Sequence, residues 1–280
     1  MMKLYGVIGD PIAHSMSPEI HNDAFDKLGI EAVYHHLHVV PDDLEAAVKG
    51  MKAIGFAGFN VTVPHKEAII PFLDEVDEAA LAIGAVNTVV RENGRFKGYN
   101  TDGMGFYRFL TEWITGELSH KKTLIIGAGG AARGIYFTLV KQGMKKADIA
   151  NRTAGRARGL IDDCPYSKES LALSIPEAEE RLADYDLIIQ TTSSGMSPNI
   201  SEKPINLSII KEQAYAADII YNPLETAFLK DAAALGARIE NGLGMFVNQA
   251  ALAFELWTGQ APDTERMQQI VLNKLGGHTC

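Results

Sequence analysis

The sequence predicts an α/β protein with two domains, and three observations lead to this expectation. A chain of 280 residues exceeds the usual size of a single hydrophobic core, so two domains are expected. Short β-rich segments alternate with amphipathic helical segments, which is typical of a mostly parallel sheet covered by helices. A glycine-rich turn near residue 127 follows an apolar strand and belongs to a second series of such units.

The composition is that of a globular enzyme, because 46% of the residues are hydrophobic and 22% are charged. The net charge of −9 argues against nucleic-acid binding, which requires a basic surface. Cys164 and Cys280 lie far apart in sequence and predict neither a disulfide framework nor a metal site. The N-terminus lacks the apolar segment of a signal peptide, and no stretch approaches the roughly 18 apolar residues of a membrane span. We therefore expect a cytoplasmic protein without membrane or nucleic-acid partners.

The first third of the chain contains strand and helix signals in alternation. Ser17-Pro18 predicts the start of a helix, with serine as N-cap and proline at N1, and this helix should end near Gly29. Asn93-Gly94 lies between two β-rich segments and predicts a two-residue hairpin turn, which adds antiparallel pairing to the sheet. The other expected elements are strands at residues 4–8, 33–39, 59–63, 86–91 and 95–99, a helix at 42–54 and a helix that begins at Pro64.

A second α/β unit follows a helix that begins near Asp102 and a polar segment at residues 115–122. One strand should lie within residues 164–176, although the pattern does not define its position. After Gly242 the chain is expected to be helical to its end, with a break at Pro262. The remaining expected strands are residues 123–126, 147–150, 187–190, 217–221 and 237–240.

Residues 127–132, GAGGAA, fit the pattern G-x-G-x-x-A directly after an apolar strand and at the start of a helix. Gly127 allows a tight turn, Gly129 lets the backbone approach a pyrophosphate, and Ala132 lets the helix pack closely on the strand. The N–H groups and partial positive charge of the helix N-terminus favour phosphate groups. In this context the pattern predicts a Rossmann-like dinucleotide-binding domain rather than a structural turn alone. Its candidate cofactor-binding residues are Gly127, Ala128, Gly129, Gly130 and Ala131.

The end of the next strand distinguishes NADP from NAD. NAD sites usually carry an acidic residue about 20 positions after the first glycine, where it binds the ribose 2′-hydroxyl. Here the residues are Asn151-Arg152-Thr153, with Arg156 one helical turn further on. Two guanidinium groups without an acid are suited to a 2′-phosphate. The alternative, two solvated arginines at a helix start, is less favourable because cations there lack an anion between them. The sequence therefore predicts NADP and leaves open whether NAD is also used.

Two segments of the first domain have an unusual density of polar side chains. The motif NVTVPHK places Asn60 and Thr62 on one face of a strand and Lys66 in the first turn of the next helix, where a lysine suits proton transfer. The second segment ends in Asp102 at a strand-to-helix junction. Taken alone, the simpler interpretation is that Lys66 lies on the surface and that Thr101 or Asp102 is a helix N-cap.

Four histidines near these segments have structural interpretations. His36 and His38 alternate on one strand, but no third ligand has a suitable spacing, so no metal site is predicted. His14 and His65 lie beside the two polar segments, and we interpret them as supporting residues rather than acid–base groups.

Blocks distributed along essentially the whole chain resemble the shikimate dehydrogenase family, which includes quinate-using members. The blocks that carry the resemblance are GDPIAHSMSP (9–18), NVTVPHK (60–66), GAVNT (84–88), GYNTDG (98–103), GAGGA (127–131), NRT (151–153), YNP (221–223), NG (241–242) and QA (249–250). The resemblance implies reversible, NADPH-dependent reduction of 3-dehydroshikimate to shikimate, in the pathway to chorismate and the aromatic amino acids.

The resemblance also implies roles for individual residues, and it makes Lys66 and Asp102 the catalytic pair. Hydride transfer to a ketone produces an alkoxide, so Lys66 would either give a proton or stabilise the charge while Asp102 orients the hydroxyl. The cofactor carries the hydride chemistry, so no metal is required. Positions that hold the substrate carboxylate or hydroxyls fall on Ser15, Ser17, Asn60, Thr62, Asn87, Tyr221 and Gln249. Cofactor positions fall on the glycine-rich turn, Asn151, Arg152, Thr153 and Arg156, with Ile219, Gly242 and Glu78 beside the nicotinamide.

Gln249 follows the cofactor domain in sequence, yet the resemblance implies a role for it at the substrate. We therefore expect the C-terminal helices to return to the first domain. The expected division is a substrate-binding and catalytic domain, residues 1–104 plus 246–280, and an NADP-binding Rossmann-like domain, residues 105–245. The active site would lie between the two domains.

Two alternatives stay open. A quinate/shikimate dehydrogenase of dual specificity would differ in the pocket around Ser15 and Ser17, because quinate has an extra hydroxyl at its carboxylate-bearing carbon. A non-catalytic, NADP-responsive binding module would keep the glycine-rich turn and Arg152 without needing Lys66 or Asp102. The expected partner is a small-molecule substrate, and the oligomeric state is open, with a homodimer as one option.

Overall fold

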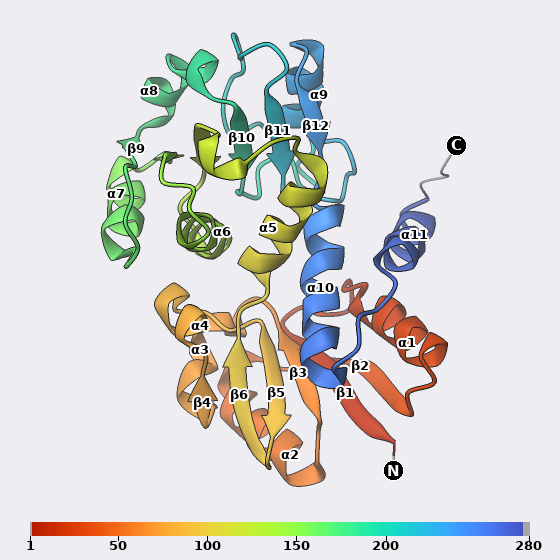
Figure 1. The fold of residues 1–280 in the computed structure, drawn as a ribbon. Coiled ribbons are helices and arrows are strands. Elements are labelled where there is room, and N and C mark those ends of the chain that lie inside the picture. Colours follow the sequence, from red (N-terminus) through yellow and green to blue (C-terminus); the bar gives the residue numbers. More distant parts are fainter. Residues whose placement is uncertain (1, 277–280) are drawn as a thin grey trace. The chain divides into compact units, whose positions relative to one another are not determined.

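The computed structural model describes residues 2–276, which form an α/β structure divided into two compact units. Unit 1 comprises the described parts of Met1–Thr101 and Val247–Cys280, and unit 2 comprises Asp102–Phe246. Each unit contains a six-stranded sheet with helices packed on it (Figure 1), which confirms the expected α/β fold class. No helix within residues 2–276 is long and apolar enough to cross a membrane.

Unit 1 is built on a mixed sheet. Its strands are β1 (Lys3–Gly9), β2 (Ala32–His38), β3 (Gly58–Val61), β4 (Glu75–Val76), β5 (Thr88–Glu92) and β6 (Arg95–Tyr99). Their order is β2-β1-β3-β5-β6-β4, with parallel pairing of β1 to both neighbours and antiparallel pairing among β3, β5 and β6. The helices are α1 (Ser17–Lys27), η1 (Pro41–Asp43), α2 (Leu44–Ile54), α3 (His65–Ala68), η2 (Ile70–Phe72), α4 (Glu78–Ile83), α11 (Thr264–Lys274) and most of α10 (Leu243–Thr258).

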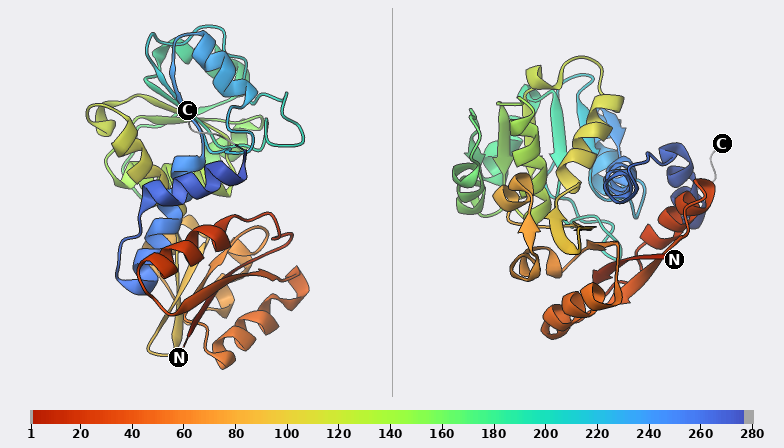
Figure 2. Two further views of the ribbon diagram at one scale, coloured as in Figure 1. Left: turned by 90° about the vertical axis from the view of Figure 1, so that its right-hand side faces the viewer. Right: turned by 60° about the horizontal axis from the view of Figure 1, so that its bottom comes forward.

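Helices cover both faces of this sheet, so β1 is buried on both sides. Ile8 belongs to the core cluster formed with α2, which includes Val48. Tyr5 points to the opposite face, because successive strand residues alternate. There its ring stacks on Phe25 of α1 and lies 5.0 Å from the ring of Trp257 in α10. Figure 2 shows α1 and α2 on opposite faces of the sheet.

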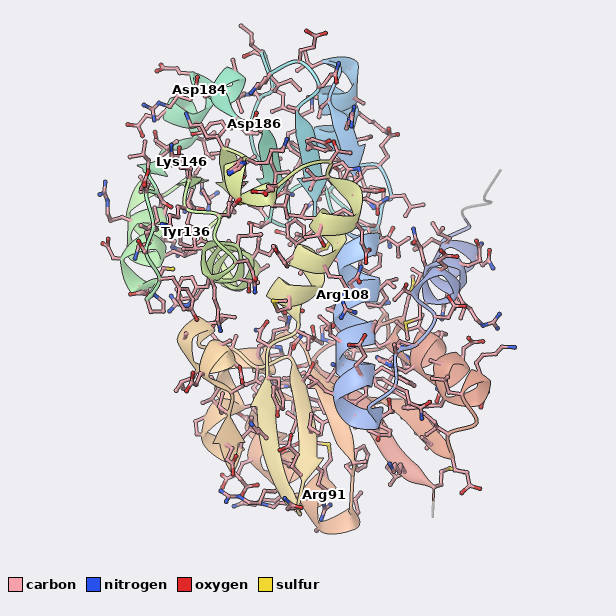
Figure 3. All side chains as sticks on the ribbon, in the orientation of Figure 1. Arg91, Arg108, Tyr136, Lys146, Asp184 and Asp186 are labelled. Carbon is pink, nitrogen blue, oxygen red and sulfur yellow. The ribbon has the colours of Figure 1, made fainter. Side chains whose placement is uncertain are left out.

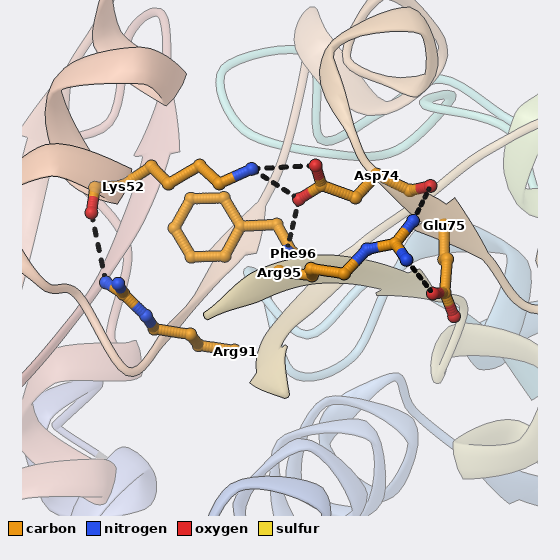
Figure 4. A network of polar contacts seen from close by, with 6 residues as sticks. All are labelled: Lys52, Asp74, Glu75, Arg91, Arg95 and Phe96. Atoms are coloured by element: carbon orange, nitrogen blue, oxygen red, sulfur yellow. Dashed lines mark hydrogen bonds and ion pairs between the residues drawn. The ribbon is translucent and has the colours of Figure 1, made fainter. Parts of the chain in front are cut away.

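A polar network holds the end of α2 to the β5–β6 hairpin (Figure 4). Both carboxylate oxygens of Asp74 accept hydrogen bonds from Lys52 Nζ at 2.7 Å, and one also accepts from the Phe96 N–H at 2.7 Å. Arg91 Nη1 donates to the Lys52 carbonyl at 3.0 Å. These bonds fix the hairpin strands whose opposite ends carry polar residues of the candidate site.

The hairpin turn is confirmed, and the expected helix start is corrected by one residue. Asn93 and Gly94 have φ values of 51° and 78°, as a two-residue turn of left-handed residues requires. At α1 the N-cap is Met16, and Ser17 is the first helical residue. The Ser17 N–H donates to Ser15 Oγ at 3.3 Å, and its hydroxyl accepts from the same atom at 3.1 Å, so Ser17 does not cap the helix.

The third strand is shorter than expected, because β3 ends at Val61 rather than at residue 63. Thr62 therefore lies just outside the strand, which corrects the expectation that it shares a strand face with Asn60. Its N–H still donates to the Ile8 carbonyl at 3.0 Å, and its carbonyl accepts from the His65 N–H at 2.9 Å. The second bond turns the chain directly into α3.

Unit 2 is built on a parallel sheet in the order β12-β11-β10-β7-β8-β9. Numbered along the unit this is 6-5-4-1-2-3, the order of a Rossmann fold, whose strand order reverses between β7 and β10. The strands are β7 (Thr123–Ile126), β8 (Ala147–Ala150), β9 (Ala172–Leu173), β10 (Leu187–Gln190), β11 (Tyr215–Asp218) and β12 (Arg238–Glu240). The helices are α5 (Asp102–Trp113), η3 (Leu118–His120), α6 (Gly130–Lys141), α7 (Ala154–Asp163), α8 (Ile175–Glu179), η4 (Leu182–Asp184) and α9 (Ala227–Ala234).

The expected bounds of β7, β8 and β10 are confirmed, and β9 lies within the expected segment. The bounds expected for β11 are wrong, because the strand ends at Asp218 instead of continuing to Tyr221. Asp218 accepts hydrogen bonds from the Ile220 N–H at 2.9 Å and from Thr226 Oγ1 at 2.7 Å, and these bonds turn the chain out of the sheet. At the start of β10, Asp186 accepts from the Lys122 N–H at 3.0 Å and so joins β10 to the start of β7 (Figure 3).

Candidate functional site

A connected hydrogen-bond network links five buried side chains of unit 1. Tyr34 Oη donates to Asn60 Oδ1 at 2.7 Å, and Asn60 Nδ2 donates to the Asn87 carbonyl at 3.1 Å and to Thr88 Oγ1 at 3.0 Å. Thr88 Oγ1 donates to Asn87 Oδ1 at 3.0 Å, which also accepts from the Thr101 N–H at 2.8 Å. Asn87 Nδ2 donates to Thr101 Oγ1 at 2.9 Å. The network joins the ends of β2, β3, β5 and β6.

The two candidate serines lie beside this network. The Ser17 side chain lies close enough to the Tyr34 hydroxyl to oppose part of the rise in its pKa that burial causes, and Ser15 bonds to Ser17 as described above. Two histidines of β2 hold the loop that carries Ser15. His36 Nε2 bonds to the Ser15 carbonyl at 2.7 Å, and His38 Nε2 bonds to Asp10 at 2.8 Å, so both histidines have a structural role.

Lys66 lies on the short helix α3 and is partly exposed. Helix α3 is too short to be stable alone, so tertiary contacts must hold it. His65 supplies one, because its buried Nε2 bonds to the Val39 carbonyl at 2.6 Å. The Lys66 carbonyl supplies another by accepting from the Val86 N–H at 2.8 Å, which brings the backbone of Lys66 next to the segment that carries Asn87.

Asp102 is the first residue of α5 and also the first residue of unit 2. Gly103 lets α5 approach α6 closely, since a Cβ at this position would lie 2.5 Å from the Gly134 carbonyl and would overlap the Thr138 hydroxyl. This contact fixes the start of α5 against the helix that follows the glycine-rich turn.

Tyr34 of the unit 1 network and the neighbouring His21 have strongly perturbed pKa values. Burial raises the pKa of Tyr34 well above its ordinary value of 10, so its phenol keeps its proton. Burial lowers the pKa of His21 from 6.5 to about 3, so its imidazole is neutral. The His21 ring stacks on Tyr34 at a centroid distance of 4.6 Å, and neither ring nitrogen has a hydrogen-bond partner among the described residues.

The glycine-rich turn of unit 2 has the geometry expected of a phosphate cradle. Gly127 has a φ of 118°, and a Cβ there would lie 2.5 Å from Thr191 Oγ1, so only glycine fits. Cβ atoms at Gly129 and Gly130 would meet no heavy atom within 4 Å, which leaves the backbone open to a ligand. Helix α6 begins at Gly130 without a side-chain cap, so its first N–H groups are available to an anion.

The end of β8 presents two guanidinium groups on the start of α7. The Asn151 side chain donates to the Thr153 carbonyl at 2.9 Å and shapes this turn. Thr153 is the N-cap of α7 but makes no side-chain capping bond. The side chains of Arg152 and Arg156 are exposed, and neither guanidinium makes a hydrogen bond or ion pair with another residue within 2–276. Free cations beside an uncapped helix start fit the phosphate of NADP.

The remaining candidate residues are divided between the units. In unit 2, Gly242 lies directly against the carbonyl of Ile219, and the Tyr221 ring packs on Phe246 at 5.0 Å. In unit 1, Gln249 is a partly exposed residue of α10. Glu78 is an exposed residue at the start of α4 in unit 1, whereas the glycine-rich turn belongs to unit 2.

Sequence reasoning missed several residues that support the candidate side chains. Tyr34, Thr88 and Thr101 connect Asn60 to Asn87, and Thr191 packs on Gly127. Thr88 and Thr101 stand inside blocks already singled out, which was a usable signal. Tyr34 lies two and four residues before His36 and His38, and this strand periodicity places all three on one face of β2. Within residues 2–276, no group of three or more His, Cys, Asp or Glu could hold a metal ion.

Comparison with known families gives three matches along the chain. A model for the substrate-binding domain of shikimate dehydrogenase matches residues 7–89. A model for shikimate/quinate 5-dehydrogenase matches residues 110–220, and one for the C-terminal domain of shikimate 5′-dehydrogenase matches residues 242–272. The first match runs from the end of β1 to the start of β5, and the second covers the Rossmann sheet from β7 to β11.

Similar proteins extend over the full length. The chain is 54% identical to a shikimate dehydrogenase (NADP(+)) of Geobacillus sp. (strain WCH70), over 99% of this chain and 100% of that one. Among solved structures, shikimate 5-dehydrogenase from Thermus thermophilus in complex with NADP(H) and shikimate is 35% identical, with a TM-score of 0.87 and coverage of 97% and 99%. Quinate dehydrogenase from Corynebacterium glutamicum in complex with NAD is 32% identical, with a TM-score of 0.89 and coverage of 97% and 99%.

Proposed function

The chain belongs to the shikimate dehydrogenase family, and we propose that it catalyses the reversible, NADPH-dependent reduction of 3-dehydroshikimate to shikimate. This reaction is a step of the shikimate pathway to the aromatic amino acids. The observation that carries the proposal is the 54% sequence identity to an NADP-dependent shikimate dehydrogenase over 99% of this chain. The geometry of both units supports it, because unit 1 has a buried polar network and unit 2 has a phosphate cradle.

The proposed substrate-binding side chains are polar, and their hydrogen-bonding groups complement the carboxylate and hydroxyls of shikimate. The hydroxyls of Ser15 and Ser17 bond to each other and can turn to donate to a carboxylate, and their backbones are held by His36 and by α1. Asn60 and Asn87 carry amides that both donate and accept, as recognition of ring hydroxyls requires. The proposed substrate-binding residues are Ser15, Ser17, Asn60, Thr62, Asn87, Tyr221 and Gln249.

Lys66 and Asp102 form the catalytic pair in this proposal. NADPH, when bound, supplies the hydride that adds to the carbonyl carbon of 3-dehydroshikimate. Lys66 gives a proton to the carbonyl oxygen or stabilises its developing charge, and it takes the proton back in the reverse direction. Asp102 accepts a hydrogen bond from the reacting hydroxyl and orients it. The anchoring of the α3 backbone by His65 and Val86 supports the role of Lys66, because proton transfer requires a positioned donor.

The residues of unit 2 fit NADP. The open backbone at Gly129 and Gly130 and the uncapped start of α6 suit the pyrophosphate. The free guanidinium groups of Arg152 and Arg156 suit the 2′-phosphate. The proposed cofactor-binding residues are Gly127, Ala128, Gly129, Gly130, Ala131, Asn151, Arg152, Thr153 and Arg156, with Ile219, Gly242 and Glu78 at the nicotinamide.

A steady-state assay tests the proposal directly. Purified protein is mixed with shikimate or quinate and with NADP or NAD, and kcat/KM is measured for the four combinations from the absorbance of the reduced cofactor. We expect the highest value for shikimate with NADP, because both serines are present and Arg152 replaces the acidic residue typical of NAD sites. A preference for quinate would contradict the substrate assignment. Cofactor binding without turnover of either acid would instead identify a non-catalytic module.

A further inference from the structure

Tyr34 lies at one end of the unit 1 network, and it is not among the proposed substrate-binding residues. Its side chain is 1% exposed, so it is supporting structure rather than a surface for substrate. Its hydroxyl donates to Asn60 Oδ1 at 2.7 Å, and the Ser17 side chain lies beside it. Tyr34 thus bonds to a residue of the proposed substrate pocket on β3 and adjoins another on α1.

We propose that Tyr34 is a positioning residue that holds the orientation of the Asn60 amide, which in turn bonds to the Asn87 carbonyl and to Thr88. This inference rests on the proposed function. An amide side chain has two orientations of similar shape, which exchange its donor and its acceptor. A buried phenol that keeps its proton is a donor toward Asn60, so Oδ1 must face Tyr34. Asn60 Nδ2 must then face the Asn87 carbonyl and Thr88 Oγ1.

The orientation passes along the network one bond at a time. Because Thr88 Oγ1 accepts from Asn60, its own proton is free to go to Asn87 Oδ1, at 3.0 Å. The Thr101 N–H donates to the same Asn87 oxygen at 2.8 Å. With its oxygen occupied by two donors, Asn87 must direct Nδ2 toward Thr101 Oγ1, at 2.9 Å. The donors and acceptors are therefore consistent along the series, which runs from the Tyr34 hydroxyl at one end to the Thr101 N–H, a fixed backbone donor, at the other.

Tyr34 is itself held without help from a ligand. Its backbone N–H donates to Asn22 Oδ1 at 2.8 Å, and its carbonyl accepts from Asn22 Nδ2 at 2.9 Å. Its ring stacks on His21 at 4.6 Å and lies 6.0 Å from the ring of Trp257. The hydroxyl is therefore placed before substrate arrives, which is the condition for a preorganised site.

The variant Tyr34→Phe keeps the ring and its stacking and removes only the hydroxyl. We expect the KM for shikimate to rise about tenfold, the size expected when a buried acceptor loses its donor. We expect kcat to change less than about twofold, because an interaction made equally in the ground and transition states affects KM. The Kd for NADPH should stay at the wild-type value, since the cofactor residues around Gly127 belong to unit 2. An unchanged KM for shikimate would overturn the inference.

Tyr136→Phe is the matched control. Tyr136 (Figure 3) is fully buried in α6 of unit 2, and among residues 2–276 its hydroxyl makes one hydrogen bond, to Ser170 Oγ at 2.9 Å. This variant should lose thermal stability much as Tyr34→Phe does, but its KM for shikimate should remain that of the wild type. An equal rise in KM in both variants would mean that the effect comes from general destabilisation, and would overturn the inference.

A double-mutant cycle with Asn60→Ala tests the path of action. If Tyr34 acts through Asn60, adding Tyr34→Phe to Asn60→Ala should raise KM by less than about twofold. The full tenfold rise in that background would show that Tyr34 does not act through the amide, against the inference. Failure of the proposed function is a separate outcome, because the wild-type protein would then not oxidise shikimate at all.

Discussion

Lowering the pH from 7 to 5 is expected to destabilise unit 1 through the imidazole of His21. The side chain is 0% exposed, and its ring lies among the rings of Tyr34, Phe254 and Trp257. Neither ring nitrogen has a hydrogen-bond partner among the described residues, so a protonated imidazole would be an uncompensated buried charge. This environment explains why the pKa falls from 6.5 to about 3.

The magnitude follows from the two pKa values. A group whose pKa is lowered in the folded state excludes protons from that state, so the unfolded chain binds more protons at pH values between about 3 and 6.5. The contribution to the free energy of unfolding is complete above pH 6.5 and is lost as the pH falls toward 3. At about 1.4 kcal/mol per pH unit, the loss from His21 between pH 7 and pH 5 is about 2 kcal/mol.

Urea unfolding at pH 7 and pH 5 measures this loss. Trp257 reports on the cluster, because its ring lies 5.2 Å from that of His21. The other tryptophan of the chain is Trp113, whose fluorescence would overlap that of Trp257, so the measurement uses a Trp113→Phe background. In this background the free energy of unfolding of His21→Phe should fall by about 2 kcal/mol less than that of the parent protein when the pH is lowered from 7 to 5. The exposed-histidine control His35→Gln should behave like the parent. Parallel pH dependences of the parent protein and His21→Phe would refute the reasoning.

Three further predictions concern activity and cofactor binding. Lys66→Ala should lower kcat by a factor of about 10² to 10⁴, as expected for the loss of a positioned proton donor. The NADPH affinity of this variant, measured by fluorescence titration, should stay near the wild-type value. Surviving activity would exclude Lys66 from the chemistry. Arg152→Ala should weaken NADPH binding by roughly tenfold or more and leave NADH binding almost unchanged, because only NADPH has the 2′-phosphate. Equal losses of affinity in the two titrations would contradict this assignment. Gly127→Ala should lower the melting temperature, since a Cβ would lie 2.5 Å from Thr191 Oγ1 at a φ of 118°, whereas Gly129→Ala should keep the melting temperature and weaken NADPH binding. Equal melting temperatures for the two glycine variants, measured by calorimetry, would contradict the proposed division between turn geometry and ligand approach.

The elements that the sequence predicted best are those specified by neighbouring residues. The strands β7, β8 and β10 are short, mostly apolar and buried, and their bounds could be read from the sequence pattern alone. The turn at Asn93-Gly94 depends on two residues that tolerate positive φ, so it too was visible in the sequence. The N-cap was misplaced by one residue, because Ser17 bonds to Ser15 two positions earlier instead of to the N–H groups of the first helical turn. The end of β11 was misjudged because Asp218 also bonds to Thr226, eight residues further on.

The sequence by itself determined the fold class, the dinucleotide turn and the cationic end of β8, because each depends on residues within one strand–turn–helix unit. Resemblance along the chain then indicated Lys66, Asp102 and the substrate-binding positions without showing how any of them is held. Only the tertiary structure decided that Tyr34 reaches Asn60 and that His21 is buried without partners among the described residues. The physical reason is that hydrogen-bond direction and burial depend on which strands and helices become neighbours. Tyr34 and Asn60 meet because β1 pairs with both β2 and β3, which places residues 26 positions apart on neighbouring parts of one sheet.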